Sequence, residues 1–148
     1  VKGQYFRVRR EKQALVNGLV YPAPEKDLLG LGIHATKDLS GSLRLGPDAG
    51  YVQAVDYSVD PSRASDFAER ARALLPFLDE ADLYPDTAGI RPKLQAKGGK
   101  PRDFEIRHEA PRGLPGLISL VGIESPGLTC CLAIAEHVKG LAEEAGLV

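Results

Sequence analysis

The segment GIESPGLTCCLAIAEHV, residues 122–138, joins a strand-like apolar run to a helix-like run. Ser125 is suited to cap a helix, Pro126 to fill its first position, and Gly127 to admit another group close to the backbone. The amides of residues 127–129 would then point beyond the strand end. Together with the helix dipole these amides would act as about half a positive charge and would favour the binding of an anion. An ordinary strand–helix turn explains the same residues, so both interpretations stay open.

A second segment that could bind a ligand is rich in basic residues. Residues 91–112 contain 7 basic and 3 acidic side chains, a net charge of +4 from 7 minus 3. Such a segment can attract an anionic ligand, although a solvated hairpin would explain it equally well. The whole chain has a net charge of −1, which argues against a general binder of nucleic acids or membrane surfaces.

Composition bounds the type of protein. The chain has 148 residues, of which 43% are hydrophobic and 26% charged, as expected for one globular domain. Its two cysteines, Cys130 and Cys131, are adjacent, so we expect no disulfide staple and no metal site. We expect a reducing, cytoplasmic location, since no signal peptide opens the chain. The sequence contains no methionine, which leads us to expect a piece of a longer protein.

The first half is predicted to be mostly antiparallel sheet, because β-branched and aromatic residues alternate between turn signals. A helix should follow, capped by Asp60, started by Pro61 and ended near Leu75 by Pro76. Residues 84–95 should be extended, residues 97–101 should form a turn and residues 103–109 a strand. The early strands are predicted at residues 2–9, 14–21, 32–36 and 42–46, with a loop at 22–30.

The end of the chain has a different pattern. Residues 116–123, GLISLVGI, are apolar on both faces, which is typical of a strand in a covered, parallel sheet. The helix after it is apolar around most of its circumference, so it too should be covered on more than one side. Parallel strands need crossover helices, and no other βαβ unit is predicted. We therefore expect the partners of this strand and helix in a segment absent from this chain.

Several segments together resemble the carboxy-terminal part of FAD-dependent oxidoreductases of the D-amino-acid oxidase/glycine oxidase family. The similarity extends over nearly the whole chain and is closest to the L-2-hydroxyglutarate dehydrogenase branch. Its most specific elements are AGIRPK (88–93) and GIESPGLT (122–129). The supporting segments are VKGQYF (1–6), LVYPAP (19–24), GIHATKDLSGSLRLGPDA (32–49), DLYPDTAGIRPKL (82–94), RDFEI (102–106) and GLPGLISLVGIESPGLTCCLAIAEHV (113–138).

The resemblance implies an α+β fold with two parts. Residues 1–112 would form the antiparallel-sheet substrate region, with helices. Residues 113–148 would be the last strand and helix of the FAD-binding, Rossmann-like domain. The family's dinucleotide-binding GxGxxG turn does not occur in this sequence, so the amino-terminal FAD-binding segment of the same protein is the expected partner. An electron acceptor or a peripheral membrane contact is a further implied partner.

The resemblance also implies roles for single residues. The turn at 122–129 would meet the pyrimidine edge of the flavin, where amides stabilise the negative charge of the reduced ring. Arg91 would bind the substrate carboxylate in two-point geometry, and Tyr21 and Lys93 would line the same pocket. His34 would accept the proton of a substrate hydroxyl while hydride leaves for the flavin. The residues expected to contact FAD are Gly122, Ile123, Ser125, Gly127, Leu128 and Thr129.

Three functions stay open at this point. The first is oxidation of a small, 2-hydroxyglutarate-like 2-hydroxy acid by hydride transfer to FAD. The second is an amino-acid or amine oxidase of the glycine or sarcosine oxidase type, since Arg91 and the 122–129 turn would serve either. The third is a non-enzymatic α+β module that binds a carboxylate or a protein partner. Glu124 differs from the basic or neutral residues of some relatives.

Overall fold

The computed structural model describes residues 1–23 and 32–148. It has an α+β fold, as predicted, and it forms two compact units, Val1–Ile90 and Arg91–Val148. The predicted loop at 22–30 falls almost entirely outside the described residues. The units divide at residue 90, whereas the proposed functional boundary lies between residues 112 and 113, which stays a prediction.

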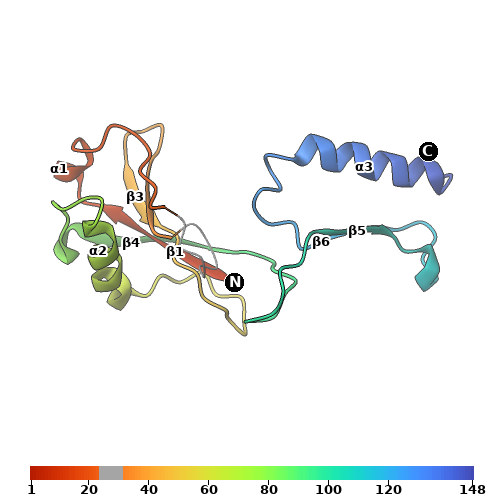
Figure 1. Ribbon diagram of the computed structural model, residues 1–148, viewed down its shortest axis with the longest axis horizontal. Coiled ribbons are helices and arrows are strands. Elements are labelled where there is room, and N and C mark those ends of the chain that lie inside the picture. The colour runs from red at the N-terminus through yellow and green to blue at the C-terminus, as the bar shows by residue number, and fades with distance from the viewer. Residues whose placement is uncertain (24–31) are drawn as a thin grey trace. The chain divides into compact units, whose positions relative to one another are not determined.

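Unit 1 contains a four-stranded antiparallel sheet in the order β2-β3-β1-β4 (Figure 1). Its strands are β1 (Lys2–Val8), β2 (His34–Lys37), β3 (Leu43–Gly46) and β4 (Leu83–Ile90). Strand β1 lies in the middle and pairs with β3 on one side and β4 on the other. The predicted strands near residues 2–9, 32–36 and 42–46 are thereby confirmed, and of the segment predicted to be extended at 84–95 the part up to Ile90 lies in β4.

The β2–β3 hairpin follows from its alternating sequence. Ala35, Leu43 and Leu45 are buried, while His34 and Thr36 alternate with them and are only partly buried. The turn between the strands is held by Asp38, whose Oδ1 accepts hydrogen bonds from the Ser40 and Ser42 amides, each at 2.9 Å. Side-chain acceptance of local amides is what makes aspartate a frequent turn residue.

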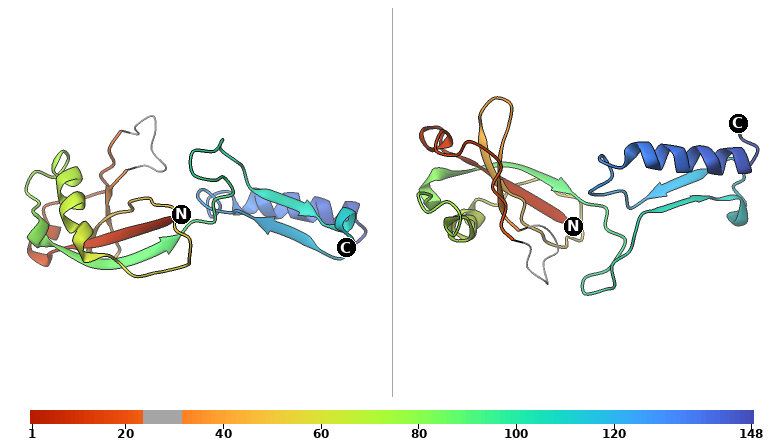
Figure 2. Two further views of the ribbon diagram at one scale, coloured as in Figure 1. Left: turned by 90° about the horizontal axis from the view of Figure 1, so that it is seen from below. Right: turned by 45° about the horizontal axis from the view of Figure 1, so that its top comes forward.

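Helix α2 (Ala64–Arg72) covers one face of this sheet (Figure 2). It is preceded by the 3₁₀ turn η1 (Pro61–Arg63), and the predicted cap is confirmed, since Asp60 Oδ1 accepts the Ser62 amide at 3.0 Å. The rings of Phe6 and Phe67 pack with centroids 4.7 Å apart. The largest fully buried side chains of this core are Phe6, Phe67, Leu43, Leu45, Leu78 and Val8.

The strand predicted at residues 14–21 is wrong. The short helix α1 (Arg10–Gln13) comes first, and only Val20 of that segment makes a β-bridge, with Ala35. Val16 enters the core, whereas Leu15 and Leu19 are more than half exposed. The apolar residues of this segment thus make isolated contacts with the core, and they do not form a strand with a continuous series of backbone hydrogen bonds. The 3₁₀ turn η2 (Glu80–Asp82) leads from the α2 region into β4.

Unit 2 contains the hairpin of β5 (Glu105–His108) and β6 (Ile118–Val121), followed by helix α3 (Cys131–Glu144). The strands are antiparallel, with Glu105 opposite Val121 and His108 opposite Ile118. The 3₁₀ turn η3 (Ala110–Arg112) lies between them. Helix α3 lies alongside the hairpin in both views of Figure 2.

Two details of the sequence prediction differ in unit 2. Strand β6 pairs antiparallel with β5, not in a parallel sheet. Helix α3 begins at Cys131 and not directly after Ser125. Residues 125–130 instead form consecutive turns, in which the Gly127 amide donates to the Glu124 carbonyl at 2.6 Å and the Cys130 amide to the Pro126 carbonyl at 3.1 Å. The turn closed by Glu124 displaces Ser125 from the capping position.

The apolar surface of unit 2 is largely uncovered. None of the residues of α3 is buried, and Leu132 on its first turn is 81% exposed. Leu120 and Val121 of β6 are also exposed. The cover expected from the sequence on both sides of this strand and helix is therefore not supplied by the described residues. Among those residues, no helix has the length and apolarity needed to cross a membrane.

Candidate functional site

Three charged side chains meet in unit 2, from the two most distinctive segments of the sequence. Lys93 Nζ donates to Glu124 Oε1 at 2.7 Å, and both side chains are nearly buried, 13% and 12% exposed. Arg91 Nη1 lies 3.6 Å from the other carboxylate oxygen, Oε2, and its side chain is 35% exposed. One carboxylate therefore serves two cations, with a direct hydrogen bond to Lys93 and a longer ion pair to Arg91.

The same two segments also pack directly against each other. Gly122 has a φ of +74°, and a Cβ built on it would lie 2.4 Å from Leu94 Cγ. The position needs glycine both for its left-handed backbone and for this close approach. The charged contact through Glu124 and the apolar contact through Leu94 together fix residues 91–94 against the turn at 122–127.

The turn itself is tight and partly exposed. Gly127 is buried, and a Cβ on it would lie 2.5 Å from Ile123 Cγ2 and 2.7 Å from the Glu124 carbonyl oxygen. Its amide is used within the turn, by the bond to Glu124 described above. This corrects the expectation that the Gly127 amide points beyond the strand end. Ser125, Leu128 and Thr129 are exposed.

A hollow of about 460 Å³ adjoins the turn, between the hairpin and α3. Its lining combines apolar side chains with polar and charged ones. The Cys130 thiol in it lies 3.7 Å from the Gly127 carbonyl oxygen. The residues that line the hollow are Arg102, Asp103, Phe104, Ile106, Glu124, Ser125, Pro126, Cys130, Ala133, Ile134 and His137.

Tyr21 and His34 form a second group, in unit 1. Their rings stack with centroids 4.6 Å apart and planes 24° apart. His34 Nδ1 lies 3.2 Å from the Gly32 carbonyl oxygen. Because a carbonyl can only accept, this contact assigns the proton to Nδ1 and the lone pair of the neutral ring to Nε2.

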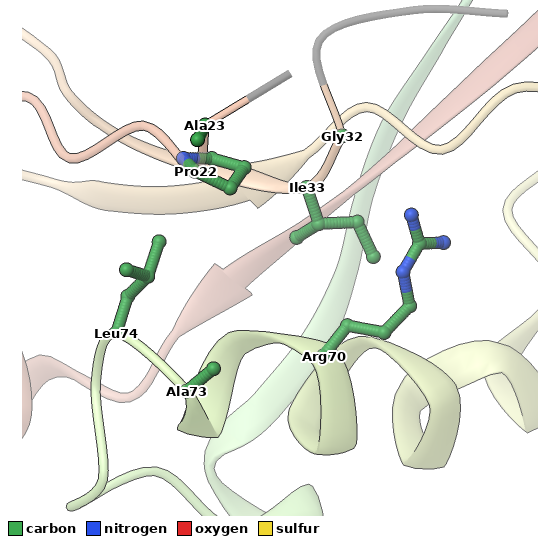
Figure 3. Close-up of a pocket in the computed structure, with 7 residues that line it drawn as sticks. All are labelled: Pro22, Ala23, Gly32, Ile33, Arg70, Ala73 and Leu74. Carbon is green, nitrogen blue, oxygen red and sulfur yellow. The ribbon is translucent and has the colours of Figure 1, made fainter. Parts of the chain in front are cut away.

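Another hollow, of about 270 Å³, lies beside α2 (Figure 3). Pro22 and Ile33, which line it, adjoin Tyr21 and His34 in the sequence, and Arg70 and Leu74 line it from the side of α2. Neither Tyr21 nor His34 is among its lining residues. Residues 24–31 lie outside the described part of the chain, and we assign no function to this hollow.

The structure therefore assembles the predicted site residues into two groups. Arg91 and Lys93 meet beside the 122–129 turn in unit 2, and Tyr21 and His34 stack in unit 1. Each group is described within its own unit.

Comparison with known proteins assigns most of the chain to a family. Residues 1–141 match the FAD dependent oxidoreductase family. The chain belongs to this family. Its residues are 43% identical to L-2-hydroxyglutarate dehydrogenase, mitochondrial, of Arabidopsis thaliana, over 93% of the chain and 30% of that protein.

More distant members of the family show the same coverage. The L-2-hydroxyglutarate dehydrogenase of Indibacter alkaliphilus is 26% identical over 93% of the chain and 42% of its own length. The glycerol 3-phosphate dehydrogenase of Caloramator mitchellensis is 30% identical over 93% and 27%. The chain thus spans between about a quarter and two fifths of the length of these relatives.

As a member of an FAD-dependent family, the chain offers one set of residues suited to the flavin. Gly122 and Gly127 sit where a Cβ would collide with Leu94 and with Ile123 and Glu124, so these glycines allow the turn to pack tightly against its own chain. Ser125, Leu128 and Thr129 face outward from it. These exposed residues could contact the edge of a planar ring, whereas the Gly127 amide is already used within the turn; the contact of the turn with the flavin stays a prediction.

Glu124 is the site residue that the sequence analysis noticed but assigned no role. Its signal was present, because it is the only acidic residue between Gly122 and Thr129 and AGIRPK supplies two cations. Spacing along the chain gives no indication that residues 31 positions apart form an ion pair. The pairing emerges only when the hairpin folds back on residues 91–94.

Proposed function

We propose that this chain is part of an FAD-dependent dehydrogenase that oxidises a small, 2-hydroxyglutarate-like 2-hydroxy acid. The observation that supports the proposal is the joining of AGIRPK to GIESPGLT through Glu124, since Arg91, the proposed ligand of the substrate carboxylate, pairs with Glu124 of the glycine turn. The 43% identity to an L-2-hydroxyglutarate dehydrogenase supports this substrate class.

Arg91 binds the substrate carboxylate in this proposal. Its guanidinium is the more exposed of the two cations beside Glu124, 35% against 13% for Lys93. A planar guanidinium donates two parallel hydrogen bonds to a carboxylate, which fixes both the position and the orientation of the substrate. Arg91 would thereby orient the carbon that carries the hydroxyl.

His34 takes the proton from the substrate hydroxyl. In this proposal Nδ1, 3.2 Å from the Gly32 carbonyl oxygen, carries the ring proton, and Nε2 is the atom that accepts the proton of the hydroxyl. The stacked ring of Tyr21 holds the imidazole plane. An imidazole titrates near neutral pH, so it can collect the hydroxyl proton and then release it to solvent.

The turn at 122–129 meets the flavin. A flavin held there would supply the acceptor for the hydride of the substrate. The exposed residues Ser125, Leu128 and Thr129 would provide the contact surface, and Gly122 and Gly127 allow the turn that carries them to pack tightly against its own chain. Amides directed at the ring would stabilise the negative charge of its reduced form by about 0.3–1 kcal/mol.

We assign β6 and α3 to the end of a Rossmann-like FAD-binding domain. The exposed apolar residues Leu120, Val121 and Leu132 support this assignment, because such residues on a strand and a neighbouring helix normally have cover. The amino-terminal FAD-binding part of the same protein would supply it.

The test is a substrate panel with the full-length gene product. The protein should copurify with FAD, and anaerobic addition of 2-hydroxyglutarate should bleach the flavin absorbance near 450 nm. Glycine, sarcosine and glycerol 3-phosphate serve as the competing substrates. Bleaching by an amine and not by any 2-hydroxy acid would refute the proposal in favour of an amine oxidase, and absence of bound flavin would refute both.

A further inference from the structure

A third hollow, of about 390 Å³, lies in unit 1 at the end of the sheet where β1 runs into α1 (Figure 1). Its volume falls within the range of about 300–1,000 Å³ that is usual for small-molecule sites. None of the described residues that line it is acidic. We call it the basic hollow, and the residues of its lining used below are Arg7, Arg9, Arg10, Ser42 and Tyr84.

Arg7, the first of the three arginines, faces another cation across the sheet. It lies opposite Arg44 of β3 on one side and opposite Tyr84 of β4 on the other, so these side chains share one face. Like charges directly opposite each other destabilise a sheet. Asp86 offsets them, since its Oδ1 accepts from Arg7 Nη2 at 2.7 Å and its Oδ2 accepts from Arg44 Nε. One carboxylate thus serves two arginines, and both of its oxygens are used.

Arg9, the second arginine, also shares its carboxylate. Its Nη2 donates to the Ala81 carbonyl at 2.9 Å, and its Nε lies 3.7 Å from Asp82 Oδ1. Asp82 forms a closer ion pair with Lys12, whose Nζ donates to Oδ2 at 2.5 Å. The side chains of Arg7 and Arg9 are 49% and 44% exposed, so their remaining N–H groups are accessible to a ligand.

Arg10, the third arginine, is uncompensated. It is exposed, and within the described part of the chain its guanidinium forms no hydrogen bond or ion pair. The lining and the side chains paired with it have a net charge of +3, from 5 minus 2: Arg7, Arg9, Arg10, Lys12 and Arg44 against Asp82 and Asp86. The charge stays positive when the neighbouring carboxylates of Glu11 and Asp38 are also counted.

We propose that the basic hollow binds a small phosphate monoester. Such a group carries a charge of about −1.5 to −2 near pH 7, which the positive excess balances, and guanidinium groups pair with its oxygens through two parallel hydrogen bonds. Ser42 adds a hydroxyl, and the half-exposed ring of Tyr84 offers a flat surface to the organic part of the ester. This site is formed within unit 1 and is independent of the proposed oxidation.

The experiment measures the binding of inorganic phosphate and of 2-glycerophosphate to the full-length protein by isothermal titration calorimetry at constant ionic strength. Acetate is the monoanion for comparison, and it should bind more weakly than both phosphates. Arg10→Gln should raise the dissociation constants of both phosphates by about fivefold, which corresponds to ~1 kcal/mol for one exposed charge interaction. Because Arg10 leaves no partner unpaired, this variant should fold like the wild type.

Arg70→Gln is the matched control, since it removes the same charge from an exposed arginine of α2, whose Nη1 lies 3.8 Å from Asp66. It should leave the phosphate dissociation constants unchanged. Equal effects of Arg70→Gln and Arg10→Gln would show a general charge effect and overturn the inference. Absence of phosphate binding to the wild type, or equal binding to the wild type and Arg10→Gln, would overturn it as well.

Two further arms separate this site from other sources of phosphate binding. Arg91→Lys alters the proposed substrate site and should leave the phosphate constants unchanged, so the two proposals can fail separately. Sedimentation with vesicles of phosphatidic acid, against phosphatidylcholine alone, tests a lipid as the source of the phosphate group. Binding of the free esters that depends on Arg10 assigns the site to a soluble ligand, whereas vesicle binding alone that depends on Arg10 assigns it to a lipid.

Discussion

The side chain of Leu94 packs directly over the α-carbon of Gly122, so that a Cβ added there would lie 2.4 Å from Leu94 Cγ. Gly122 also has a left-handed backbone, with a φ of +74°. We therefore expect Gly122→Ala to destabilise the full-length protein by about 2–4 kcal/mol, from the backbone cost and the overpacking combined. Urea unfolding followed by circular dichroism measures the change.

Gly140→Ala is the control for that substitution. Gly140 lies within α3, and nothing is within 4 Å of a Cβ built on it. Alanine in a helix interior is favoured over glycine by about 0.5–1 kcal/mol, so this variant should be slightly more stable than the wild type. Equal stability losses at the two glycines would contradict the specific role of the Leu94 contact.

The sequence predicted elements well where local chemistry decides them. The β2–β3 hairpin followed from alternation around the Asp38 turn, and η1 and α2 followed from the Asp60 cap and Pro61. Each of these signals acts within a few residues. The strand expected at 14–21 failed because β structure depends on a partner strand, and there only Val20 finds one.

The sequence motifs pointed to three of the features that the fold brings together, but not to the way in which they pair. The family motifs identified Arg91, Lys93 and the 122–129 turn, and the fold brings these together. The helix start was misplaced, since Ser-Pro-Gly can open a helix or close a turn, and the 2.6 Å bond from the Gly127 amide to the Glu124 carbonyl decides for the turn. That hydrogen bond joins two backbone groups, so the types of the side chains do not predict it.

Arg91→Lys should weaken the binding of a substrate carboxylate by about 1.5–3 kcal/mol, the range for a hydrogen bond to a charged group. Lysine keeps the charge but cannot provide two parallel donors. The dissociation constant of 2-hydroxyglutarate, from a flavin titration under anaerobic conditions, measures the loss. Arg112→Lys, at a 64% exposed arginine of η3, is the control and should have no effect. An unchanged affinity for Arg91→Lys would exclude the carboxylate role.

His34→Ala should lower kcat for a hydroxy acid by about 10²–10⁴-fold, the usual contribution of a general base. A neutral amine has no hydroxyl proton to lose, so its turnover, where present, should change little. Tyr21→Phe keeps the stacked ring and should retain most activity. Stopped-flow reduction of the flavin isolates this step. Small, equal effects on both substrate types would remove His34 from the mechanism.

The buried carboxylate of Asp82 should make the stability of the fold depend on pH. Its Oδ2 accepts from Lys12 Nζ at 2.5 Å and from the Asp79 amide at 2.9 Å, and Arg9 lies 3.7 Å from Oδ1. The Lys12 hydrogen bond is the main cause that lowers the pKa of Asp82, with the Asp79 amide and the Arg9 charge adding to it and burial opposing it.

Because its folded pKa lies below the unfolded value of about 3.9, Asp82 stabilises the fold fully above that value. The contribution is lost as pH falls through the lower folded pKa. Asp82→Asn should therefore cost about 1–3 kcal/mol at pH 7, and the gap to the wild type should narrow only below about pH 4. Thermal unfolding from pH 3 to 8 measures it. Asp66→Asn, at a 44% exposed aspartate, should cost less than 1 kcal/mol. If the stability difference between the wild type and Asp82→Asn became smaller as the pH rose, the lowered pKa assigned to Asp82 would be contradicted.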